Sequence, residues 1–157
     1  MTSAREAAER ALAAIDGSRR PEAWISRFGP AEVLARADDI DAQVRSAADL
    51  PLAGLTFAVK DNIDIAGLPT TAGCPAFSYL PEHDAPAVRA LTQLGALCLG
   101  KTNLDQFATG LVGTRSPYGA VRSASDPDLI AGGTSSGSAV VVALGEVDLA
   151  LGTDTAG

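Results

Sequence analysis

This sequence has a single histidine, only two cysteines and no long hydrophobic run. The lone histidine, His83, is the one base open to a hydrolase of the Ser–His–Asp type, and it stands in a polar segment where we expect an exposed helix start. The two cysteines, Cys74 and Cys98, are too few and too far apart for a disulfide framework or a clustered metal site. The sequence therefore predicts reduced thiols and no metal.

Positive charge is also scarce, because 12 Lys and Arg stand against 19 Asp and Glu, which gives a net charge of −7. Nucleic acid binding favours a basic surface, so we expect no nucleic acid partner. No apolar run approaches the roughly 20 residues of a membrane-spanning helix, and the first residues lack the apolar core of a signal peptide. We therefore expect no membrane contact and a cytoplasmic protein.

What the sequence does have is enough apolar residues, 46% of the total, to pack the core of one domain. Amphipathic patterns predict two helices, at 3–16 and 30–48, and residues 1–50 are assigned as an N-terminal helical segment. From residue 51 onward, short apolar strands are expected at 55–60, 63–65, 95–100 and 149–151. They alternate with helices expected at 136–144 and from either Asp84 or Pro86 to Gln93. This alternation indicates an α/β fold with helices flanking a sheet.

Three segments could carry chemistry. Lys60 ends an apolar strand, where desolvation lowers the pKa of an amine toward that of a base, although such a lysine can also extend to water. The loop at 132–138 holds four hydroxyls within five residues, more than one helix cap or anion-binding turn needs. The loop at 152–157 offers successive backbone amides of the kind that bind an oxyanion. Together the three segments favour a hydrolase.

Longer motifs at 54–64, 100–107 and 132–157 resemble those of the amidase signature family, which hydrolyses amides with a serine, a cis-peptide serine and a lysine. The resemblance spans about residues 52–157. Within the family, the loops at 68–77 and 108–119 look most like those of allophanate hydrolases. The resemblance implies a mixed sheet flanked by helices, with residues 51–157 forming the first part of the family's domain.

The resemblance also implies a role for each candidate residue. Lys60 would be the base, and Thr134, where the family has serine, would be the cis-peptide relay between that base and the nucleophile. The reaction would be acyl transfer without metal or organic cofactor, and allophanate would yield ammonia and carbon dioxide in urea degradation. The loops would supply oxyanion-hole amides from Thr155, Ala156 and Gly157, with supporting hydrogen bonds from Ser135 and Asp154.

The nucleophilic serine of the family would be the residue after Gly157. We therefore expect these 157 residues to be a fragment that is inactive by itself, from an enzyme that acts on a small-molecule amide and is compatible with a homodimer. Three other interpretations stay open: another amidase of the family, the amidase component of glutaminyl-tRNA amidotransferase, and a non-catalytic binding module. The residues after Gly157 and the intact mass of the protein would separate them.

Overall fold

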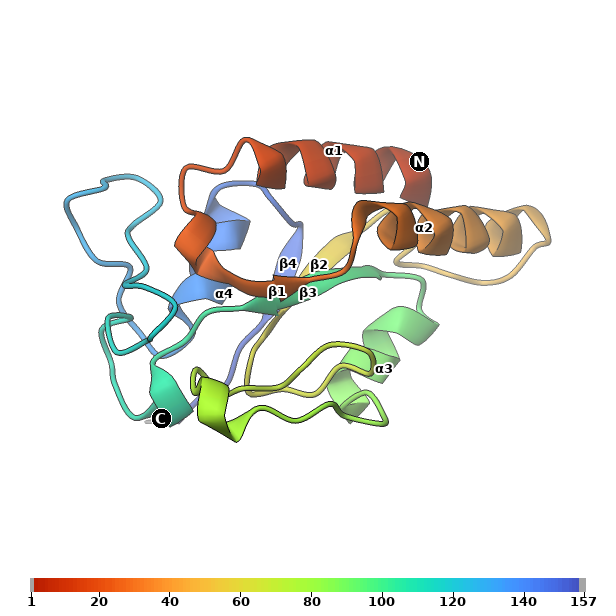
Figure 1. The fold of residues 1–157 in the computed structure, drawn as a ribbon. Helices are drawn as coiled ribbons and strands as arrows, with labels where there is room; N and C mark the ends of the chain where they lie inside the picture. Colours follow the sequence, from red (N-terminus) through yellow and green to blue (C-terminus); the bar gives the residue numbers. More distant parts are fainter. Residues whose placement is uncertain (1, 156–157) are drawn as a thin grey trace.

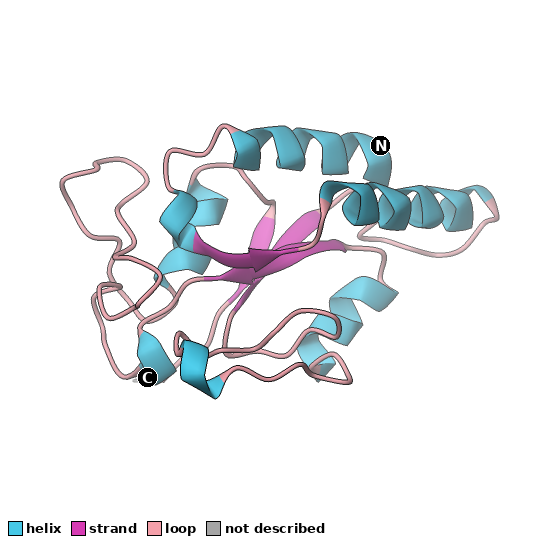
Figure 2. Ribbon diagram, in the orientation of Figure 1, coloured by secondary structure: helices cyan, strands magenta, loops and turns pink. Residues whose placement is uncertain are grey.

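The computed structural model describes residues 2–155 and places their strands in a four-stranded sheet with helices on both faces (Figures 1 and 2). The strands are β1 (Trp24–Arg27), β2 (Thr56–Lys60), β3 (Leu97–Thr102) and β4 (Leu149–Leu151). The α-helices are α1 (Ala4–Asp16), α2 (Pro30–Arg45), α3 (Pro86–Gln93) and α4 (Ser136–Ala143). Short 3-10 turns lie at η1 (Pro21–Ala23), η2 (Pro75–Phe77) and η3 (Gln106–Ala108).

The sheet has the order β1-β3-β2-β4, with β2 parallel to both of its neighbours and β1 antiparallel to β3. Every residue of β2 and β3 is buried, as expected for central strands covered on both faces. The predicted α/β fold with a mixed sheet is therefore confirmed. Because β2, β3 and β4 are parallel, their carboxyl ends meet at one edge, where sheets of this kind commonly bind ligands.

The two N-terminal helices form as their sequence patterns predict. Ser3 caps α1 in a capping box with Glu6, and Pro30 occupies the first turn of α2. The Asp41 carboxylate on α2 accepts hydrogen bonds from the amides of Ala4 (2.8 Å) and Arg5 (3.1 Å), which ties the start of α1 to α2. The two helices lie side by side over one face of the sheet, and α3 lies on the other (Figure 1).

The N-terminal segment also contributes β1 to the sheet, and the division at residue 50 stays a prediction. Gly100 on β3 permits the close approach of β1, since a Cβ there would lie 2.4 Å from the Ser26 carbonyl oxygen. In the part of the chain from residue 2 to 155, no helix has the length and apolar character needed to cross a bilayer.

The prediction of a strand at 63–65 is wrong, because the chain forms no strand there. The Asp61 amide still bonds the Thr102 carbonyl (3.0 Å), but the Ile63 amide turns back to the Lys60 carbonyl (2.9 Å). The chain therefore leaves the sheet immediately after Lys60 and enters a long loop. His83 is exposed in that loop, as expected, and the helix after it begins at Pro86, one of the two expected starts.

Helix α4 packs closely against η1 and the residue after β3 because its first turn is made of small residues. A Cβ at Gly137 would lie 2.5 Å from both the Ala23 carbonyl oxygen and the Asn103 nitrogen. The Ser138 hydroxyl contacts the Thr102 hydroxyl (2.7 Å) and donates to the Leu151 carbonyl (3.0 Å). The start of α4, and the hydroxyl-rich loop before it, are thereby held at the carboxyl ends of the strands.

Candidate functional site

Lys60 is the centre of the site. It is the last residue of β2 and is fully buried. Its Nζ donates hydrogen bonds to Thr134 Oγ1 (2.8 Å), Ser135 Oγ (2.9 Å) and Thr153 Oγ1 (2.7 Å). The structure thus brings Lys60 together with two of the residues predicted from the sequence, and adds a third hydroxyl that was not predicted.

The surroundings of Lys60 favour loss of its proton. Burial lowers the pKa of Lys60 to about 8, while the negative charge of Asp105 acts in the opposite direction. The direct hydrogen-bond partners of the amine are neutral hydroxyls rather than a carboxylate, so they stabilise its charge only in part. A neutral amine beside a hydroxyl can accept a proton from it, which is the capacity expected of a base.

Residues 132–135, which we call the hydroxyl loop, face Lys60 and turn in a different way from the one expected. The peptide bonds of residues 2–155 are all trans, so the expected cis peptide at Thr134 is not found. Gly132 (φ 80°) and Gly133 (φ 71°) adopt left-handed conformations instead. Two consecutive left-handed glycines reverse the chain without strain and present the Thr134 hydroxyl to Lys60.

Ser135 joins this loop to the loop after β4. Its hydroxyl accepts from the Thr153 amide (3.3 Å) and donates to the Thr153 carbonyl (3.4 Å). The fit is close, because a Cβ at Gly152 would lie 2.8 Å from Ser135 Oγ. These bonds favour the supporting role implied for Ser135, which stays a prediction.

The oxyanion hole stays a prediction. Thr155, the first residue of the expected hole, is exposed in the loop after β4, as is Asp154 before it, for which a supporting role is implied. The other two residues of the expected hole, Ala156 and Gly157, lie outside the described residues.

Thr153 is the site residue that sequence reasoning missed. Its hydroxyl oxygen accepts from Lys60 and also from the Asn62 side-chain amide (3.3 Å). One signal could have found it. Thr153 comes two residues after the end of β4, parallel to β2, and so reaches the same sheet edge as Lys60.

A second buried lysine lies next to the site in a different setting. Lys101 Nζ lies 3.3 Å from Asp61 Oδ1 and donates to Thr70 Oγ1 (2.9 Å), and both charged side chains are fully buried. The other Asp61 oxygen accepts from the amide (3.0 Å) and the hydroxyl of Thr71. Because a carboxylate balances its charge, Lys101 serves to fasten the loop after β2 to β3.

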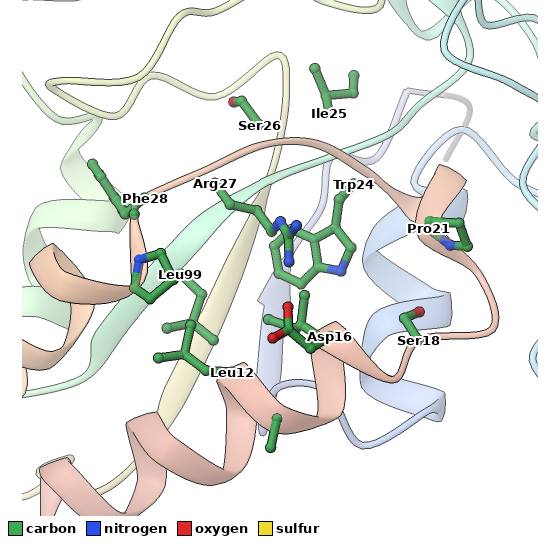
Figure 3. A pocket seen from close by; sticks show the side chains of 14 residues that line it. Leu12, Asp16, Ser18, Pro21, Trp24, Ile25, Ser26, Arg27, Phe28 and Leu99 are labelled. Carbon is green, nitrogen blue, oxygen red and sulfur yellow. The ribbon is translucent and has the colours of Figure 1, made fainter.

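A large cavity lies elsewhere, between α1 and β1 (Figure 3). It has a volume of about 740 Å³ and is lined largely by apolar side chains, among them Leu12, Trp24, Phe28 and Leu99. None of the site residues predicted from the sequence lines it. The candidate site therefore lies at the strand ends and not in this cavity.

Comparison with known proteins agrees with the family resemblance and with the fold. The family model described as Amidase matches residues 6–157. The chain is 53% identical over 135 residues to the urea amidolyase of Saccharomyces cerevisiae. It is 43% identical over 145 residues to a glutamyl-tRNA(Gln) amidotransferase chain of Akkermansia muciniphila. Among solved structures, the allophanate hydrolase of Kluyveromyces lactis superposes with a TM-score of 0.86 at 44% identity.

These matches cover most of the chain but a small share of each relative. The alignment with the yeast urea amidolyase takes in 86% of the chain and 7% of that protein. The corresponding shares are 92% and 29% for the amidotransferase, and 99% and 26% for the allophanate hydrolase structure.

Proposed function

Because this chain belongs to the amidase family, we propose that it forms the proton-accepting part of the active site of an amide hydrolase that acts on allophanate. The observation that carries the proposal is the contact of the buried Lys60 amine with the hydroxyls of Thr134 and Ser135. A base and a hydroxyl in direct contact form the core of an activated-nucleophile site.

The protonation state of Lys60 decides how the site works. In its charged form, the three N–H bonds of the amine match the three hydroxyl oxygens around it. Once one proton is lost, the lone pair turns to a hydroxyl that can donate. The Ser135 hydroxyl already donates to the Thr153 carbonyl, so Thr134 is the better relay.

The proposed reaction follows from that relay. Lys60 takes the Thr134 proton while the Thr134 oxygen takes the proton of the nucleophilic serine, which directly follows the position of Gly157 in the family pattern. The serine oxygen bonds to the amide carbon, and the relayed proton passes to the leaving nitrogen as the C–N bond breaks and ammonia departs. Water then repeats the same steps on the acyl-enzyme and releases the acid. Amides of Thr155, Ala156 and Gly157 are proposed to bind the oxyanion.

The choice of allophanate is supported by the relatives. A urea amidolyase and an allophanate hydrolase both match with more than four-tenths identity over most of this chain. A second candidate is the release of ammonia from glutamine for a glutamyl-tRNA amidotransferase, supported by 43% identity over 92% of the chain.

The test measures ammonia released from allophanate and from glutamine by the full-length gene product. We expect allophanate to be the substrate, and Lys60→Met to reduce turnover by a factor of about 10³, in the range that general base catalysis supplies. Arg45→Met, an exposed cation at the end of α2, is the matched control and keeps full activity. The proposal fails if Lys60→Met retains activity, or if its activity and its melting temperature fall together.

A further inference from the structure

A buried carboxylate beside the site has no part in the proposed proton relay. Asp105 follows β3, is fully buried and accepts three backbone hydrogen bonds. Its Oδ2 accepts from the amides of Val112 and Gly113 (both 3.1 Å), and its Oδ1 accepts from the amide of Arg115 (2.7 Å). One side chain thus gathers a loop of residues 110–115, which we call the clasped loop.

The clasped loop touches the hydroxyl loop at two points. The Leu111 carbonyl accepts a hydrogen bond from the Gly133 amide (2.9 Å), one residue before Thr134. Gly113 lies against Ser136, one residue after Ser135, so that a Cβ on Gly113 would be 2.7 Å from the Ser136 Cβ. The clasped loop therefore supports both sides of the Thr134–Ser135 pair that faces Lys60.

The packing around Asp105 leaves little freedom. A Cβ at Gly110 would lie 2.1 Å from Asp105 Oδ2, and the Arg115 carbonyl accepts a hydrogen bond from the Gln106 amide (2.7 Å). Burial alone raises the pKa of Asp105, but the three amides and the charge of Arg115 outweigh it and lower that pKa below its ordinary value. The carboxylate is therefore ionised at neutral pH and fixed in place.

We propose that Asp105 is a positioning residue for the Lys60 site, because its buried carboxylate holds the clasped loop against the hydroxyl loop and sets a fixed negative charge near the amine. The proposal rests on the proposed role of Lys60 as a base. It assigns to Asp105 two separable effects, one on geometry and one on charge.

The charge effect has a definite sign. The negative charge of Asp105 raises the pKa of Lys60 and so limits the fall caused by burial. Among the other charged groups nearby, Asp61 and Lys101 pair with each other, Arg115 lies on the clasped loop and Asp154 follows β4. The segment 132–145, which includes α4, carries no charged residue. Removing the Asp105 charge therefore lowers the pKa of Lys60 further.

The test compares two substitutions at residue 105 in the full-length gene product. Asp105→Asn removes the charge and replaces one of the two oxygens that accept hydrogen bonds from the backbone N–H groups. We therefore expect turnover to fall roughly tenfold to hundredfold. The acidic limb of the profile of kcat/KM against pH moves to lower pH. Asp105→Glu keeps the charge on a longer stem, so turnover falls while the limb stays where it is in the parent protein.

Asp148→Asn is the matched control. The Asp148 carboxylate also binds a backbone amide, that of Thr56 (2.7 Å), but at the opposite end of β2 from Lys60. We expect the Asp148→Asn variant to leave the profile of kcat/KM against pH unchanged. Hydrogen exchange gives a second measurement, in which Asp105→Asn speeds exchange at the amides of Val112, Gly113, Arg115 and Gly133.

The outcomes separate this inference from the proposed function. A parent protein with no acidic limb, or an active Lys60→Met variant, overturns the role of Lys60 itself. An intact limb that neither Asp105 variant moves, with turnover and amide exchange as in the parent, overturns the role of Asp105 alone. Should Asp105→Asn fail to fold, Asp105→Glu decides, because full turnover in that variant contradicts the geometric effect.

Discussion

Lys60 and Lys101 are the only lysines in the sequence, and both are fully buried at the carboxyl end of the sheet. Burial lowers the pKa of each, but the partners differ. Lys101 lies against the Asp61 carboxylate, which favours its charged form, whereas Lys60 faces three hydroxyls. The difference in partners supports the proposed role of Lys60 as the base and favours a structural role for Lys101.

Lys60, Thr134 and Ser135 could be chosen from the sequence because each carries a reactive group in a recognisable motif. Thr153 and Asp105 could not be chosen from a local motif, although the position of Thr153 just after β4 indicates the sheet edge that it reaches. Thr153 contacts Lys60 from 93 positions away in the chain, and Asp105 binds backbone amides, so neither contact leaves a local pattern. The course of the hydroxyl loop was likewise decided by the two left-handed glycines before Thr134.

Thr134 gives the first test at the scale of a residue. Its hydroxyl is the proposed relay, and its methyl group only restricts rotation about χ1. In the full-length gene product we expect Thr134→Ser to match or exceed the parent activity. Thr134→Val keeps the shape and removes the hydroxyl, so turnover should fall strongly. If the valine variant turns over as fast as the parent, the relay must be assigned to Ser135.

At the scale of the element, the strand ends and the start of α4 build the site together. Apolar runs and Gly-rich loops predicted β2, β3, β4 and α4 within a few residues. The prediction of a strand at 63–65 was wrong because its Ile-Asp-Ile pattern is typical of a strand. In the structure, the hydrogen bond from the Ile63 amide to the Lys60 carbonyl makes a turn instead. Local patterns thus identify the elements, and the long-range hydrogen bonds decide where the chain leaves the sheet.

Gly137 tests the close approach of α4. A Cβ there would overlap backbone atoms of Ala23 and Asn103, which cannot move without shifting η1 and the end of β3. We expect Gly137→Ala to lower the free energy of unfolding by about 1–3 kcal/mol, as overpacking at a rigid contact does. Chemical denaturation of the full-length gene product measures this change.

Gly29→Ala is the control for that prediction. Gly29 precedes α2 with φ at −64°, and a Cβ on it would meet nothing within 4 Å. Its replacement should change the unfolding free energy by no more than about 0.5 kcal/mol. Equal effects from the two alanine variants would show that α4 does not depend on a glycine at its first turn.

At the scale of the whole molecule, the mixed sheet explains why one edge holds the chemistry. Three parallel strands direct Lys60, Thr102 and Leu151 to the same edge, and α4 places the hydroxyl loop above it. The α/β class and the family followed from the sequence, and the structure and the family match confirm both. The domain division at residue 50, the cytoplasmic location and a homodimer stay predictions.

The central claim is that Lys60 acts as a neutral base with a pKa of about 8. The most direct measurement is kcat/KM for allophanate hydrolysis by the full-length gene product across the range from mildly acidic to alkaline pH. Since the protonated amine cannot accept a proton, we expect kcat/KM to rise about tenfold per pH unit below that pKa and to level off above it. A profile that stays flat through this range, or that falls as the pH rises, would contradict the account.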